Sequence, residues 1–280
     1  MTFLEEIENH PLCGDGAMGT LLMERGIPAE QCFEELCVAQ PALILGIHTD
    51  YLAAGARVIR TNSFGANAVR LARHGLEGRV NEINWQAAQI AKEAAKGTGA
   101  YVAGSVGPLG ISAGEASERM IDREKSFRTH IGALLDGGVN LIFLETFQDL
   151  DELLLALRVK QSLHHCPAIC SLAVRDDGTL PDGTSLEAAF AKLVQNEADI
   201  LGFNGSTDPQ AALDVMRRAL PKEPPLAVFP NAGTNQNSPP ADFAEKGLQI
   251  IAAGARIIGG CCGTTPAHIA AMAKLLAETR

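Results

Sequence analysis

The chain has 280 residues, of which 46% are hydrophobic and 20% are charged, and its formal net charge is −10. No basic patch rises from this acidic background, so we do not expect nucleic acid as a partner. The first sixteen residues carry three glutamates and no apolar run, and no stretch approaches the roughly 18 consecutive apolar residues of a membrane span. We therefore expect a cytoplasmic protein with no secretory signal and no membrane contact.

Short apolar runs alternate along the chain with longer segments that have helical spacing. Eight runs predict strands: 11–16 (PLCGDG), 57–64 (RVIRTNSF), 101–108 (YVAGSVGP), 141–147 (LIFLETF), 168–174 (AICSLAV), 200–206 (ILGFNGS), 226–233 (LAVFPNAG) and 256–263 (RIIGGCCG). Helices are predicted between them at 80–96, 123–138, 149–163, 185–198 and 209–221, with capping residues at Asp149, Thr184 and Asp208.

Apolar strands that are joined by helices indicate a parallel sheet covered on both faces. Eight strand–helix units within 280 residues favour a closed (β/α)8 TIM barrel. No linker or low-complexity stretch divides the chain, so we expect residues 1–280 to form one domain. The alternative is a doubly wound open sheet. Such a sheet usually has fewer strands, and the chain lacks a GxGxxG motif after its first strand.

The carboxyl ends of the strands in a parallel barrel meet at one face, where the active site lies. Asp15 and Glu145 follow the first and fourth runs, and they could hold a substrate ammonium, act as a base or bind a metal. The backbone amides of Ala17 and Met18 could form a nest for a carboxylate. Together these groups would suit an amino acid. A turn is the alternative role of Asp15, whereas an unpaired Glu145 would be costly to bury.

Two adjacent cysteines, Cys261 and Cys262, follow the last run and are flanked by glycines. Adjacent cysteines do not easily form a disulfide with each other, because their geometry is poor. Zinc prefers thiolates, and the glycines would permit the bend that brings both sulfurs to one ion. The alternative is two small buried residues at a strand end. Asn62, Asn204 and Asn231 end other runs and could orient a substrate, shape loops or contact a metal.

The motifs DGAMGT, TNSFGAN, LETF, PNAG and GGCCGTTPAHI occur in this order along the chain. With them, the sequence resembles the homocysteine S-methyltransferase family over nearly its whole length. The resemblance implies a TIM barrel with a zinc–thiolate site at its mouth. It implies zinc as the cofactor, with Cys261 and Cys262 as two of its ligands. Asn231 is similar in position to an amide that can occupy the fourth zinc position when substrate is absent.

The resemblance also implies an enzyme that transfers a methyl group to the homocysteine thiol and gives methionine. Asp15 and Glu145 would hold the homocysteine ammonium, and the Ala17–Met18 backbone its carboxylate. Asn62 and Ser105 are further candidates for substrate contacts, and the thiols with Glu145 are the catalytic candidates. The methyl donor could be S-methylmethionine, S-adenosylmethionine, betaine, a methylfolate or a methyl-corrinoid protein, because no motif specifies adenosine or a pterin.

One position departs from the family. The third zinc ligand of the family is a cysteine in a G-x-N-C motif, whereas this chain reads GFNG and carries Gly205 there. Three explanations are open. Ser206, Asn204 or Cys170 could replace the ligand; the site could have lost zinc; or Gly205 could be an introduced substitution. The alternative function is accordingly a metal-free barrel that binds an amino acid or a thiol without zinc–thiolate chemistry.

Overall fold

The strands form a parallel barrel. The structure is a computed structural model that describes residues 2–205, 208–218, 223–233 and 238–279. Neighbouring strands pair in the order β1-β8-β7-β6-β5-β4-β3-β2, and every pairing is parallel. The ring closes through a bridge between Gly14 and Val58. The predicted TIM barrel is thus confirmed, and its strands are β1 Leu12–Cys13, β2 Val58–Arg60, β3 Tyr101–Val106, β4 Leu141–Phe147, β5 Ala168–Leu172, β6 Ile200–Asn204, β7 Leu226–Phe229 and β8 Ala255–Ile258.

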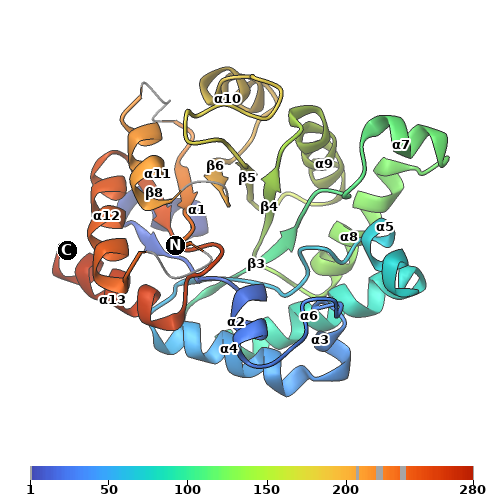
Figure 1. Cartoon of the computed structure of the whole chain (residues 1–280), viewed down its shortest axis with the longest axis horizontal. Coiled ribbons are helices and arrows are strands. Elements are labelled where there is room, and N and C mark those ends of the chain that lie inside the picture. The colour runs from blue at the N-terminus through green and yellow to red at the C-terminus, as the bar shows by residue number, and fades with distance from the viewer. Residues whose placement is uncertain (1, 206–207, 219–222, 234–237, 280) are drawn as a thin grey trace.

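Helices surround the strands (Figure 1). The α-helices are α1 Phe3–Asn9, α2 Gly19–Glu24, α3 Leu36–Ala39, α4 Pro41–Ala53, α5 Ala68–Leu71, α6 Val80–Ala95, α7 Ala113–Glu118, α8 Arg123–Asp136, α9 Leu150–Leu163, α10 Leu186–Gln195, α11 Pro209–Met216, α12 Pro240–Ala252 and α13 Pro266–Glu278. Two short 3-10 helices, η1 Ala72–His74 and η2 Glu77–Arg79, precede α6. Within the described ranges, no helix has both the length and the apolar character needed to cross a bilayer.

The predicted helix caps agree with the structure at two of three positions. The Asp149 and Asp208 side chains accept hydrogen bonds from the first-turn amides of α9 and α11. The prediction at Thr184 is wrong by one residue, because Ser185 accepts the bond from the Ala188 amide of α10. Both hydroxyls are suitable caps, so their side-chain chemistry alone does not separate the two positions.

Apolar side chains fill the barrel towards the amino ends of the strands, and polar side chains form a layer at the carboxyl ends. Side chains alternate along each strand, so Val58, Phe143 and Phe229 point into the barrel and pack together, and α1 adds its own apolar side chains to this cluster. Two residues beyond Val58 and Phe143 on their strands, the same alternation turns Arg60 and Glu145 inward. Buried charged side chains therefore lie at the carboxyl ends of these strands, next to the apolar cluster inside the barrel.

A buried histidine outside this layer gives a pH-dependent prediction. His48 in α4 is fully buried, and its ring nitrogens have no hydrogen-bond partner among the described residues. Burial lowers the pKa of His48 from 6.5 to about 4. As the pH falls below 6.5, His48 is protonated in the unfolded chain before it is protonated in the folded one. The free energy of unfolding therefore decreases between pH 6.5 and about 4. His48→Phe should abolish this decrease, which amounts to about 3 kcal/mol, as measured by urea unfolding at several pH values. An unchanged pH profile would contradict this assignment.

Candidate active site

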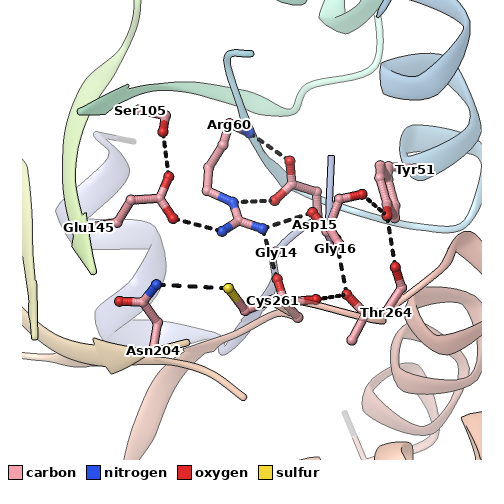
Figure 2. A network of polar contacts seen from close by, with 12 residues as sticks. Gly14, Asp15, Gly16, Tyr51, Arg60, Ser105, Glu145, Asn204, Cys261 and Thr264 are labelled. Carbon is pink, nitrogen blue, oxygen red and sulfur yellow. Dashed lines mark hydrogen bonds and ion pairs between the residues drawn. The ribbon is translucent and has the colours of Figure 1, made fainter. Parts of the chain in front are cut away.

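Arg60 lies between the two predicted carboxylates (Figure 2). Its Nε is 2.7 Å from Asp15 Oδ1, and its Nη1 is 2.9 Å from Glu145 Oε2. The Arg60 backbone amide also donates to Asp15 Oδ2 at 2.7 Å. Asp15 and Glu145 do meet at the barrel mouth, but a cation missed by our sequence analysis joins them. Its signal was a charged residue at the end of an otherwise apolar run, VIR at 58–60.

The same guanidinium also links the segments that follow β1 and β8. Arg60 Nη2 donates to the carbonyls of Gly16 and Gly260 at 2.8 Å each, and its guanidinium lies 4.8 Å from the ring centroid of Phe229. Although burial disfavours its charge, Asp15 and Glu145 raise the pKa of Arg60 above its ordinary value. One cation between two carboxylates leaves this cluster with one unit of negative charge when all three are ionised, which matches a single substrate ammonium.

The backbone nest after β1 is partly occupied within the protein. The Ala17 amide donates to Thr264 Oγ1 at 3.0 Å, and the Ala17 carbonyl accepts a hydrogen bond from the Tyr51 hydroxyl at 2.6 Å. Met18 follows at the start of α2, and no acceptor for its amide is found in the described part of the chain. Of the two amides that we expected to bind a carboxylate, only that of Met18 is available.

Ser105 and Asn62 occupy different surroundings. The Ser105 hydroxyl donates to Glu145 Oε1, so it orients the carboxylate from the side opposite Arg60. The Asn62 side chain donates to the Phe33 carbonyl at 2.7 Å. Asn62 thus anchors the loop that contains Phe33. Ser105 and Asn62 line the same cavity.

Asn204 holds the end of β4 in an unusual conformation. Thr146 has a φ of 64°, in the left-handed region that β-branched residues rarely adopt. The Asn204 Oδ1 accepts from the Thr146 amide at 2.9 Å, and its Nδ2 donates to the Thr146 hydroxyl at 2.7 Å. Asn204 Oδ1 also accepts from the Ser171 hydroxyl. The Asn204 side chain is therefore engaged in shaping the strand end beside Glu145.

The two cysteines lie at the bend that follows β8. The Cys261 amide donates to the Pro230 carbonyl at 2.8 Å, and the Cys262 carbonyl accepts from the Ala232 amide at 2.9 Å. Gly263 has a φ of 80°, and a Cβ placed there would lie 2.0 Å from a backbone oxygen, so this bend requires glycine. The pairing with Cys261, and then Arg60, lower the pKa of Cys262 below its ordinary value, and the same pairing raises the pKa of Cys261.

The described residues around Cys261 supply only part of a metal-ligand set. No group of three or more His, Cys, Asp or Glu side chains suited to a metal occurs within the described residues. A Cβ built on Gly205 would lie 3.7 Å from Cys261 Sγ, so this glycine borders the thiol. Asn231 Nδ2 donates to the Gly205 carbonyl at 2.9 Å, and its Oδ1 is buried without a partner among the described atoms. The candidate donors among the described residues are therefore two thiols and one unpartnered amide oxygen, fewer than a metal site normally has.

Two of the other proposed replacements for the missing ligand can be placed. Cys170 is fully buried in the core cluster that includes the surrounding helices, away from the barrel interior, because strand alternation turns it to that face. The Asn204 oxygen already accepts two hydrogen bonds, as described above. Ser206 lies outside the described residues.

A single cavity of about 300 Å³ joins the charged cluster to the thiols. Its walls come from β2, β3, β4 and the segments after β1, β6 and β8, so residues far apart in the sequence line one space. The lining residues that concern us are Asp15, Ala17, Met18, Arg60, Asn62, Ser105, Glu145, Gly205, Cys261 and Cys262. Asn231 is not among them and contacts this region through Gly205.

Comparison with known proteins agrees with this arrangement. The family model for homocysteine S-methyltransferase matches residues 12–276. The chain is 33% identical to homocysteine S-methyltransferase of Escherichia coli over 92% of this chain and 93% of that protein. It is 31% identical to methionine synthase of Mycobacterium tuberculosis over 99% of this chain. The match spans 25% of the length of that relative.

A solved structure shows the same architecture. The metallated form of the homocysteine methyltransferase MmuM from Escherichia coli superposes with a TM-score of 0.80 and 31% identity, covering 96% of this chain and 97% of that one. The match of the family model to nearly the whole chain agrees with the resemblance seen in the sequence motifs. The chain belongs to the homocysteine S-methyltransferase family.

Proposed function

We propose that this protein methylates the thiol of homocysteine to give methionine, and that zinc assists the reaction. The observation that carries the proposal is the single cavity in which a carboxylate cluster for an ammonium lies beside two thiols. An amino acid with a sulfur at the end of a short side chain matches that pairing. Family membership supports the same acceptor.

Each residue has a defined role in this proposal. Asp15 and Glu145 accept the homocysteine ammonium, with Arg60 fixing both carboxylates, and the Met18 amide donates to the substrate carboxylate. The substrate thiol gives up its proton, its sulfur forms a bond to the methyl carbon, and the donor departs with the electron pair of the broken bond. A zinc ion held by Cys261, Cys262 and Asn231 would favour the thiolate, because coordination deprotonates a thiol near neutral pH.

A second function follows from Gly205. With a glycine beside Cys261, and without a group of three His, Cys, Asp or Glu ligands among the described residues, the barrel could bind an amino acid or a thiol without metal chemistry. Titration calorimetry with homocysteine and with methionine, each with and without zinc, distinguishes the two proposed functions. Zinc-dependent binding of homocysteine supports the methyltransferase, whereas equal binding of methionine and homocysteine without metal supports a barrel that only binds an amino acid or a thiol.

The direct test is formation of methionine. The protein is incubated with homocysteine and, in turn, S-methylmethionine, S-adenosylmethionine, betaine, a methylfolate and methylcobalamin, each with zinc or with a chelator. Methionine is quantified by mass spectrometry against a protein-free control. We expect zinc-dependent methionine with at least one donor. No methionine with any donor, together with metal-free amino-acid binding, would overturn the proposal in favour of the second function.

A further inference from the structure

The end of β4 that carries Glu145 departs from regular strand geometry. We infer that Asn204 is a positioning residue for the substrate ammonium: its side chain holds Thr146 in a β-bulge, and the bulge aims the Glu145 carboxylate into the cavity. The inference rests on the proposed function, in which Glu145 accepts the ammonium. It adds a residue of β6 that acts on the substrate only through β4.

The bulge is visible in the pairing of β4 with β5. Between Leu144 and Phe147, β4 uses one more residue than the paired segment of β5, Cys170–Leu172. The left-handed φ of 64° at Thr146 falls within this stretch. Bulges of this kind reorient side chains and are over-represented next to active sites.

The bulge turns two consecutive side chains towards the substrate. In a regular strand, neighbouring side chains point to opposite faces, yet Glu145 and Thr146 both line the cavity. Regular alternation would then place Phe147 inside the barrel with Glu145. Instead Phe147 packs with Leu144 in the cluster that includes the surrounding helices. The extra residue therefore keeps Phe147 in the outer core while Glu145 and Thr146 face the cavity.

Asn204 supplies the contacts that hold the bulge. Its Oδ1 accepts from the Thr146 amide at 2.9 Å, and its Nδ2 donates to the Thr146 hydroxyl at 2.7 Å. The Ser171 hydroxyl donates to the same Oδ1 at 2.7 Å and so fixes the carboxamide itself. Asn204 is buried and is not among the described residues that line the cavity. A strained φ at a β-branched residue persists only where surrounding contacts impose it, and these contacts do so.

The aim of Glu145 depends on the backbone that Asn204 restrains. Arg60 and Ser105 hold the oxygens of the Glu145 carboxylate (Figure 2), but they do not set the direction in which the side chain leaves the strand. That direction follows from the backbone at Glu145 and Thr146. Without Asn204, Thr146 should relax to an ordinary extended φ, and the carboxylate should lose its aim at the ammonium.

The test compares two ligands that differ only in the amino group. Methionine and its desamino analogue, γ-methylthiobutyrate, are titrated by calorimetry into the natural protein and into Asn204→Ala, with a chelator present so that no metal takes part. We expect the natural protein to bind methionine about a hundredfold more tightly than the analogue, because charge-assisted hydrogen bonds to the ammonium are strong. Asn204→Ala should retain less than about a tenth of that preference.

A second substitution distinguishes lost aim from general damage. Glycine adopts a left-handed φ without help, so Thr146→Gly added to Asn204→Ala should restore most of the preference for methionine. Asn140→Ala is the matched control, because the Asn140 side chain also holds a strand amide, that of Val102 at 2.8 Å, at the amino ends of the strands. It should lower the melting temperature and leave the preference unchanged. If Asn204→Ala fails to fold, Thr146→Val removes only the hydroxyl that Asn204 binds and should reduce the preference by about threefold or more.

The outcomes separate this inference from the proposed function. An unchanged preference in Asn204→Ala, a loss that Thr146→Gly does not reverse, or equal binding of both ligands by the natural protein would overturn the inference. If the natural protein still forms methionine, only the inference is overturned. A preference that depends on Asn204, without methionine formation with any donor, would keep the positioning role and overturn the proposed methyl transfer.

Discussion

Replacing Arg60 with methionine should destabilise the barrel by about 3–5 kcal/mol, because it leaves two buried carboxylates without their cation. Asp15 and Glu145 are 3% and 5% exposed, so water cannot take over the role of the guanidinium. The variant also loses the hydrogen bonds that join Gly16 to Gly260. The melting temperature should fall by roughly 10 °C, and homocysteine binding should be lost because its anchors are no longer fixed.

Two further variants separate charge compensation from general damage. Arg57→Met removes a neighbouring arginine whose ion pair with Glu6 is partly exposed, and it should cost no more than about 1 kcal/mol. Adding Asp15→Asn to Arg60→Met removes one uncompensated charge and should recover part of the lost stability. Purely additive losses in the double variant would contradict the assignment of Arg60 as the shared cation of this pair.

The fold was predictable because its signals are repeated. Eight apolar runs separated by helical segments leave few topologies, and each unit supports the same answer. The convergence of Asp15 and Glu145 followed directly, since parallel strands bring their carboxyl ends together. These conclusions required only the order of elements and the chemistry at the end of each strand.

The finer site was not predictable, because it depends on which groups already have partners. The sequence shows that Ala17 has a backbone amide, but not that Thr264, 247 residues away, accepts its hydrogen bond. Arg60 could have been suspected from its charge within an apolar strand. Its simultaneous contacts with β1, β4 and the bend after β8 required the three-dimensional arrangement.

Changing either Cys261 or Cys262 to serine should lower the rate of methionine formation by about a thousandfold or more. In the proposed zinc site each change would remove one of the two thiolate ligands, and metal activation of a nucleophile contributes several kcal/mol to a reaction of this kind. The rate is measured at saturating homocysteine with the donor that the natural protein accepts. Cys166→Ser is the control, since Cys166 precedes β5 at the opposite end of the barrel, and it should change the rate less than about threefold.

The binding of methionine shows whether such a loss concerns the reaction or the pocket. The carboxylates, Arg60 and the Met18 amide remain in the cysteine variants, and the product needs no thiolate to occupy that part of the cavity. Calorimetry should therefore find methionine binding within a few fold of the natural protein. A cysteine variant that still forms methionine at the natural rate would exclude the thiol pair from the reaction. The carboxylate cluster would then have to position the homocysteine thiol for attack by itself, without assistance from a metal held at Cys261 and Cys262.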